Sequence, residues 1–230
     1  MGDKEMTLGL VLTAVIVLIF LYAAYKARGK QTRPPQRSQS VKSTHADIRE
    51  DVAKLARALL SDTGVVYLDA ETTDINKPEI VELAILNFEG KTLFNQRINP
   101  ATPIRTAATE VHGIKKRDLK NCPTWPDVHK QVDRLLLGKT VIIYNADFDV
   151  KALKTTCDIH GLRLPRFKDV CLMKIYASYV GEWNEYREDF KWHKLTKALR
   201  DCGLGDQSQI HRAEDDARHV YQLVQYLAAQ

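Results

Sequence analysis

The stretch that most constrains the fold of this chain is a short apolar run that ends in two carboxylates. Residues 65–68 are β-branched, aromatic or apolar, which predicts a strand buried on both faces. Asp69 and Glu71 follow at its end, and side chains two positions apart in a strand project from the same face. Such a pair repels unless a positive charge joins it, and a hard divalent cation with oxygen ligands is the usual solution. Taken alone, the pair fits a solvated acidic loop equally well.

The beginning of the chain has a different composition from the rest. A charge-free apolar segment begins at Thr7 and ends at Tyr25. As a helix, its nineteen residues would be roughly 28 Å long, close to the thickness of a bilayer's hydrocarbon core. A cleaved signal peptide is the alternative, but it should begin with a basic region, and here two acidic residues outnumber one Lys before the segment. The pattern therefore favours a retained transmembrane helix.

The distribution of basic residues predicts the orientation of this segment. One Lys precedes it, whereas five Lys or Arg follow it within a short distance. Positive charge is retained on the cytoplasmic side of a membrane, so the downstream part should be cytoplasmic. The sequence thus predicts a single-pass protein of the cell membrane, with a transmembrane anchor at residues 1–26, a basic flexible linker at 27–45 and a folded cytoplasmic domain at 46–230.

The folded domain carries no excess of positive charge. Residues 1–45 contain seven Lys or Arg and two Asp or Glu, which accounts for the whole net charge of +5. Residues 46–230 therefore hold 27 charges of each sign, so the basic pI does not by itself indicate that this domain binds nucleic acid. The four cysteines have no paired spacing, which favours reduced thiols over disulfides or a zinc site.

The order of the predicted elements favours an α/β fold. A capping box predicts a helix that starts after Thr44 and ends near Ser61. Two more strands are predicted at residues 79–88 and 91–98, so three antiparallel strands open the domain. The later predicted elements are a strand at 140–144 and helices at 106–111, 125–137, 148–160, 169–179, 194–202 and 212–229. This order predicts a mixed sheet, with antiparallel strands followed by parallel strands, flanked by helices.

Two further acidic motifs stand at junctions between predicted elements. Asp149 ends the run YNADFD, where a strand passes into a helix. His211 and Asp216 belong to the run HRAEDDA, where a loop enters the last helix. Strand ends and helix starts face the same crevice in open α/β sheets, so both motifs are candidates for one site with Asp69 and Glu71.

These segments together resemble the DEDDh exonucleases, a group that includes the proofreading epsilon subunit of bacterial DNA polymerase III. The resemblance covers about residues 64–229 and excludes the apolar segment. The matching segments, in the family's order, are Asp69-x-Glu71-Thr72-Thr73, Val111-His112-Gly113-Ile114, Asn145-Ala146-x-Phe148-Asp149 and His211-Arg212-Ala213-x-x-Asp216-Ala217. Any one of these motifs is weakly specific, but four in this order are strongly specific. The resemblance implies a ribonuclease H-like sheet and a metal-dependent 3′–5′ exonuclease.

The resemblance also implies a role for each motif residue. Two divalent ions, Mg²⁺ or Mn²⁺, would activate the attacking water and stabilise the leaving 3′ oxygen. The carboxylates that would hold them are Asp69, Glu71, Asp149 and Asp216. The general base would be His211, whose ordinary pKa of about 6.5 suits proton transfer near neutrality. The residues that would hold the terminal nucleotide are Thr72, Thr73, Val111, His112 and Phe148.

The last motif contains two adjacent carboxylates, Asp215 and Asp216. The His-x₄-Asp spacing of the family selects Asp216. Asp215 would point about 100° away around the helix, because 3.6 residues make one turn. Asp216 is therefore the predicted metal ligand.

The chain departs from the family pattern in two places. Asp74 stands where a glycine often follows the first motif, so the loop over the terminal nucleotide can close differently. Residues 180–193 insert four aromatic side chains among charges. These aromatics would either pack a helical hairpin onto the core or form a stacking wall for an unpaired base.

The sequence therefore predicts a membrane-anchored, metal-dependent exonuclease that removes nucleoside monophosphates from the 3′ end of DNA. An exoribonuclease is the first alternative, since the same motifs serve both substrates and only contacts to the 2′-hydroxyl would distinguish them. The second alternative is a catalytically silent, membrane-tethered module that binds nucleic acid or a protein partner. The general base predicted at His211 argues against it, because a binding module needs none. The sequence indicates no particular protein partner.

Overall fold

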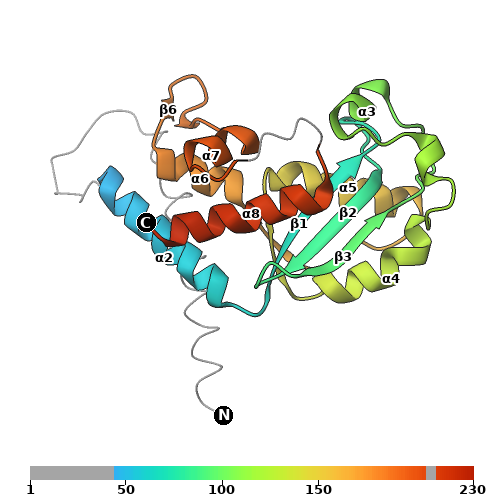
Figure 1. Ribbon diagram of the computed structural model, residues 1–230, viewed down its shortest axis with the longest axis horizontal. Helices are drawn as coiled ribbons and strands as arrows, with labels where there is room; N and C mark the ends of the chain where they lie inside the picture. Colours follow the sequence, from blue (N-terminus) through green and yellow to red (C-terminus); the bar gives the residue numbers. More distant parts are fainter. Residues whose placement is uncertain (1–43, 206–210) are drawn as a thin grey trace, which may run out of the picture.

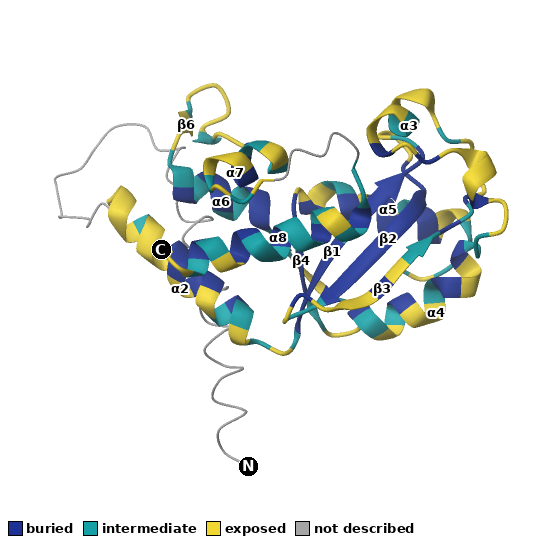
Figure 2. Cartoon of the chain, viewed as in Figure 1, coloured by how far each residue is buried: buried dark blue, intermediate teal, exposed yellow. Residues whose placement is uncertain are grey.

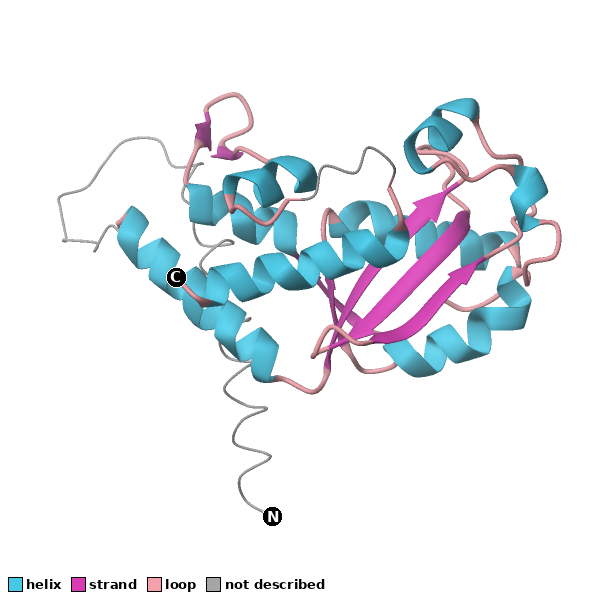
Figure 3. Cartoon of the chain, in the orientation of Figure 1, coloured by secondary structure: helices cyan, strands magenta, loops and turns pink. Residues whose placement is uncertain are grey.

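The central feature of the fold is a five-stranded mixed sheet with helices on both faces, seen in the computed structural model, which describes residues 44–205 and 211–230 (Figures 1 and 3). The strands lie in the order β3-β2-β1-β4-β5. Their bounds are β1 Val65–Thr72, β2 Ile80–Asn87, β3 Thr92–Arg97, β4 Thr140–Ile143 and β5 Lys168–Cys171. β1, β2 and β3 pair antiparallel, whereas β4 pairs parallel with both β1 and β5. The predicted α/β class and the change from antiparallel to parallel pairing are thus confirmed.

The helices form a layer on each face of this sheet. Their bounds are α2 His45–Ser61, α3 Thr106–His112, the 3₁₀ helix η2 Lys116–Leu119, α4 Trp125–Leu136, α5 Ala146–Ile159, α6 Leu172–Val180, α7 Leu195–Asp201 and α8 Ala213–Ala228. Helices α2, α6 and α8 share one apolar cluster with the sheet, and α4 and α5 share the other. The predicted cap of α2 is present: Thr44 Oγ1 accepts from Asp47 N at 3.2 Å, and Asp47 Oδ2 accepts from Thr44 N at 2.6 Å.

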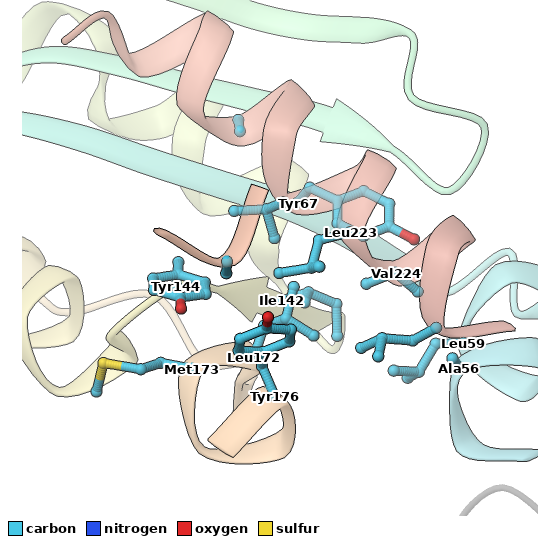
Figure 4. Packing of buried hydrophobic residues seen from close by; sticks show 14 of the residues in the cluster. Ala56, Leu59, Tyr67, Ile142, Tyr144, Leu172, Met173, Tyr176, Leu223 and Val224 are labelled. Atoms are coloured by element: carbon cyan, nitrogen blue, oxygen red, sulfur yellow. The ribbon is translucent and has the colours of Figure 1, made fainter. Parts of the chain in front are cut away.

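The alternation of side chains along β1 divides the core between the two faces. Tyr67 belongs to the cluster with α2, α6 and α8, where Figure 4 shows it near Leu223 and Val224. The next residue, Leu68, belongs to the cluster on the opposite face of the sheet, which includes the fully buried Trp125 of α4. β1 and β2 are buried along most of their length, whereas the edge strands β3 and β5 are largely exposed or half-buried (Figure 2). Because the period of a strand is two residues, Asp69 and Glu71 continue the face that α8 covers.

Two predicted helical regions have a different structure. Residues 168–171 form the edge strand β5 where the sequence analysis placed the beginning of a helix, and α6 starts only at Leu172. A four-residue strand is too short to show a reliable period, which explains this error. The insertion at 180–193 forms a two-stranded sheet, β6 (Trp183–Asn184) and β7 (Asp189–Phe190), rather than a helical hairpin. Glu188 turns the chain between these strands with a φ of 50°.

The predicted membrane location is corrected. The segment from Thr7 to Tyr25 and most of the linker lie outside the described residues. Within 44–205 and 211–230, no helix is both long enough and apolar enough to cross a bilayer. The longest helix there, α2, has 17 residues, and its exposed side carries charged residues, so it packs on the domain instead. A cell-membrane location therefore has no support from the described elements and is not carried further. The predicted division into anchor, linker and domain remains a prediction.

Candidate active site

The end of β1 brings together carboxylates from two separate segments. Glu71 is buried at 8% exposure, and Asp69 is partly buried on the same face of the strand. Asp149 comes from the first turn of α5, and its Oδ1 accepts a hydrogen bond from Ala70 N at 3.1 Å. Asn145 caps α5 with a φ of 64°, a left-handed conformation that asparagine tolerates well. This sharp turn, directly after β4, places Asp149 beside the strand.

Helix α8 supplies the fourth carboxylate. Asp216 lies in its first turn, and His211 Nδ1 is 2.8 Å from Asp216 Oδ2. His219 Nδ1 is 3.5 Å from the other oxygen, Asp216 Oδ1. Asp215 is exposed, so Asp216 is the member of the adjacent pair that faces the site.

The electrostatics of the site differ between the two groups of carboxylates. Burial raises the pKa values of Asp69 and Asp149 well above their ordinary range, and neighbouring carboxylates add to the effect. Burial and the charge of Asp216 raise the pKa of Glu71 to about 7. These shifts show that the charged forms of the three groups repel one another in a poorly solvated place.

Near His211 the electrostatic effects have the opposite result, because they favour the charged forms of Asp216 and His211. Burial raises the pKa of Asp216, but the hydrogen bond from His211 and the nearby charges of His211 and His219 outweigh it, so this pKa lies below its ordinary value. The hydrogen bond to Asp216 raises the pKa of His211, while burial and the charge of Lys194 oppose the rise. Protonated His211 therefore offsets part of the negative charge.

This donor set fits divalent ions. Ligand atoms of Glu71, His211 and Asp216 lie within 4.8 Å of one another, and Asp69 and Asp149 lie beside them. A cluster of carboxylate oxygens is the environment that hard cations such as Mg²⁺ and Mn²⁺ prefer. Bound cations would remove the mutual repulsion that the raised pKa values report. All four residues assigned to metal binding from the sequence are thus in one place.

Two of the residues predicted to hold the terminal nucleotide are accessible beside this cluster. Val111, near the end of α3, is 48% exposed, which is unusual for a large apolar side chain. Phe148, in the first turn of α5, is partly exposed and directly precedes Asp149. Both can offer apolar surface to a base or sugar.

The other three predicted nucleotide contacts are buried and form a framework. Thr73 Oγ1 accepts from Glu79 N at 3.1 Å. His112 Nδ1 accepts from Ile114 N at 3.0 Å, so its Nε2 carries the proton and donates to Thr72 O at 3.1 Å. His112 therefore ties the end of α3 to the end of β1, behind the exposed Val111.

Three polar residues at the site were not identified from the sequence. Glu82 Oε2 accepts from Ala213 N, the first residue of α8, at 3.1 Å. Arg212 Nη1 donates to His112 O at 2.8 Å, and Lys194 is close enough for its charge to act on His211. The available signal for Glu82 was a charged residue within the apolar run of β2. Arg212 stands in the last motif but was given no role of its own there, and Lys194 gave no signal.

The aromatic insertion stands beside the start of α5. Lys174 Nζ is 2.8 Å from Asp147 Oδ2 and 5.8 Å from the centre of the Trp192 ring, which Arg187 also covers at 5.2 Å. Tyr186, in the turn, is 97% exposed. Lys174 thus connects the insertion to the start of α5 through its cation–π contact with Trp192.

Comparisons with known proteins give consistent matches. The family model described as exonuclease, RNase_T, matches residues 66–224. The "Uncharacterized exonuclease CP81" of Escherichia phage 186 is 32% identical over 184 residues, which cover 77% of this chain and 94% of the phage protein. The DNA polymerase III subunit epsilon of Rickettsia prowazekii is 32% identical over 95 residues, or 38% of this chain and 42% of that protein. The nuclease domain of 3′hExo, described as a DEDDh family member bound to rAMP, has the same fold, with a TM-score of 0.56, 22% identity and coverage of 72% and 92% of the two chains.

Proposed function

We propose that this chain, which belongs to the RNase_T family of exonucleases and is a 3′–5′ exonuclease of the DEDDh type, releases nucleoside monophosphates from DNA. It would remove them from the 3′ end with the help of two divalent ions. The ligands in this proposal are Asp69, Glu71, Asp149 and Asp216. The observation that carries it is the convergence of carboxylates from β1, α5 and α8 with a histidine paired to one of them. The silent binding module is set aside, because the family is one of enzymes.

The residues of the chain have distinct tasks in this reaction. Bound Mg²⁺ or Mn²⁺ would activate the attacking water and stabilise the leaving 3′ oxygen. Asp69 and Glu71 are presented by the central strand, which pairs on both sides and is therefore rigid. Asp149 is held to the same strand through Ala70 N. These buried groups must lose their protons for the ions to bind, so metal affinity should rise with pH.

His211 is the proposed general base. Its Nδ1 donates to Asp216 Oδ2, which leaves Nε2 for proton transfer. A base of this kind takes the proton of the attacking water as the phosphodiester bond is broken. Val111 and Phe148 are the proposed apolar contacts of the terminal nucleotide, with Thr72, Thr73 and His112 supporting them from behind.

The choice of DNA over RNA is the part of the proposal that needs the sharpest test. One relative is a DNA polymerase subunit, whereas one protein of the same fold is described in complex with rAMP. The experiment is digestion of matched single- and double-stranded DNA and RNA, each labelled at the 5′ end, by the full-length protein with Mg²⁺ or Mn²⁺. We expect ladders that shorten from the 3′ end of DNA and disappear with EDTA. Faster loss of RNA would support the exoribonuclease alternative, and shortening from the 5′ end or activity in EDTA would contradict the mechanism.

A further inference from the structure

A row of charged side chains crosses three strands and ends at the proposed metal site. Glu71 of β1 is paired in register with Glu82 of β2, and Glu82 is paired with Arg97 of β3. Side chains paired in this way lie next to each other on one face of a sheet. Arg97 Nε donates to Glu82 Oε1 at 3.2 Å, so Glu82 has a cationic partner on the side away from Glu71. Glu82 is nevertheless only 6% exposed.

The start of α8 depends on this carboxylate. The N-cap position of the helix is Arg212, whose side chain can only donate hydrogen bonds and makes no cap. The next residue, Ala213, is fully buried, so water cannot satisfy its N–H. Glu82 Oε2 accepts from this N–H at 3.1 Å. The cap that helix starts normally receive from their own N-cap residue therefore comes from β2.

The position of this contact matters for the site. Asp216 follows Ala213 by three residues within the first turn of α8, and His211 precedes Ala213 by two residues. A shift of the helix start would move both of these side chains relative to Glu71, which is fixed in the central strand.

We propose that Glu82 is a positioning residue, whose carboxylate fixes the start of α8 and so holds Asp216 and His211 at the separation from Glu71 that divalent ions need. The proposal rests on the proposed metal-dependent function and adds a residue outside the set of metal ligands. Glu82 acts through the backbone of Ala213 and touches neither ion nor substrate. The length of the Glu82 side chain, and not its negative charge, is the property that sets the position of α8.

Two conservative variants separate the effect of the length of the Glu82 side chain from the effect of its charge. Glu82→Asp keeps the charge but is one methylene shorter, so it loses contact with Ala213 N. Glu82→Gln keeps the length and an accepting oxygen but loses the charge. The readouts are the Mn²⁺ dissociation constant from calorimetry on the full-length protein and the amide hydrogen exchange of residues 213–217 in the metal-free state. We expect Glu82→Asp to weaken Mn²⁺ binding by about 10–100-fold, the typical effect of losing an outer-shell contact, and to speed exchange, while Glu82→Gln stays within about threefold of the wild type.

Glu214 provides the matched control. This carboxylate also lies in the first turn of α8, but it connects the helix to β3. It accepts hydrogen bonds from Thr92 Oγ1 and Asn95 Nδ2. We expect Glu214→Gln to lower the thermal midpoint without weakening Mn²⁺ binding. Equal weakening in Glu214→Gln would overturn the proposal by showing a general effect of stability. If Mn²⁺ bound more weakly to Glu82→Gln than to Glu82→Asp, the charge of Glu82 would be the property that matters and the proposal would be overturned. If the wild type bound no Mn²⁺, the proposed function would be overturned as well.

Discussion

Asp69 lies among several like-charged neighbours. Burial raises its pKa, and the charges of Asp149, Asp216 and Glu71 raise it further. Asp69→Asn should abolish nearly all exonuclease activity, because it removes a metal ligand. The same change should raise the thermal midpoint of the metal-free protein, because it removes repulsion between buried groups. Nuclease assays and thermal unfolding in EDTA measure these two effects.

The neighbouring carboxylate at the last motif provides a control for this prediction. Asp215 is exposed and lies next to the proposed metal ligand Asp216 in sequence. Asp215→Asn should keep both activity and stability close to the wild type. Equal losses for Asp215→Asn and Asp216→Asn would contradict the assignment of Asp216 to the site.

The proton-transfer role proposed for His211 can be tested separately from metal binding. His211→Ala should lower turnover by about 10²–10⁴-fold, the usual contribution of a general base, while binding of the nucleic acid is largely kept. Removal of its hydrogen bond to Asp216 should not remove the oxygen ligands of the ions. Single-turnover rates and binding to an uncleaved strand in Ca²⁺ are the measurements. Normal turnover between pH 6 and 8 would mean that another group is the base.

At the scale of elements, Glu79 joins three parts of the chain behind the site. Its buried carboxylate accepts from Ala101 N and Thr102 N, both at 2.7 Å, and lies 2.9 Å from His160 Nε2 at the end of α5. Burial alone raises the pKa of Glu79, but hydrogen bonds from Thr102, Ala101 and His160 outweigh it and keep this pKa below its ordinary value. The contact therefore connects the start of β2, the loop before α3 and α5.

This lowered pKa predicts how stability depends on pH. A carboxylate with a lower pKa in the folded state stabilises the fold above its unfolded pKa of about 4.5, and this stabilisation is lost as the pH falls through the folded value. Glu79→Gln should therefore reduce the loss of stability between about pH 5 and 3. Glu79→Ala should cost about 1–3 kcal/mol near pH 7, because it leaves the partly buried N–H groups of Ala101 and Thr102 without their acceptor. Urea unfolding at a series of pH values tests both, and an unchanged pH dependence in Glu79→Gln would contradict the assigned role.

At the scale of the whole molecule, metal ions should connect segments that are far apart in sequence. The proposed ligands come from β1, α5 and α8, so ions bound by them would stabilise only the folded chain. At a free concentration of about 100 times the dissociation constant, one ion should add about 2.7 kcal/mol to the free energy of unfolding. Mn²⁺ should thus raise the thermal midpoint of the wild type and not that of Asp69→Asn. An equal rise in both proteins would show that the ion binds elsewhere.

The sequence by itself predicted the class of fold and the change from antiparallel to parallel pairing, and its motifs, through their resemblance to a known family, pointed to the residues at 69, 71, 149, 211 and 216. These properties depend on local chemistry, since apolar runs, caps and turn residues act within a few positions. The family match supports the enzyme class, while the individual roles of these residues remain proposals. The short edge strand β5 and the β6–β7 hairpin were missed because elements of two to four residues have no period to read.

Only the tertiary structure decided how the site is supported. Nothing near Glu82 in the sequence indicates that it meets the N–H of Ala213, 131 positions away. The same holds for Arg212 and the carbonyl of His112, which are 100 positions apart. The structure likewise shows that Thr73 and His112 are buried whereas Val111, among the residues proposed to hold the nucleotide, is exposed. Such contacts depend on strand register and on the path of α8 across the sheet, and those are set by the packing of the whole core rather than by any local pattern.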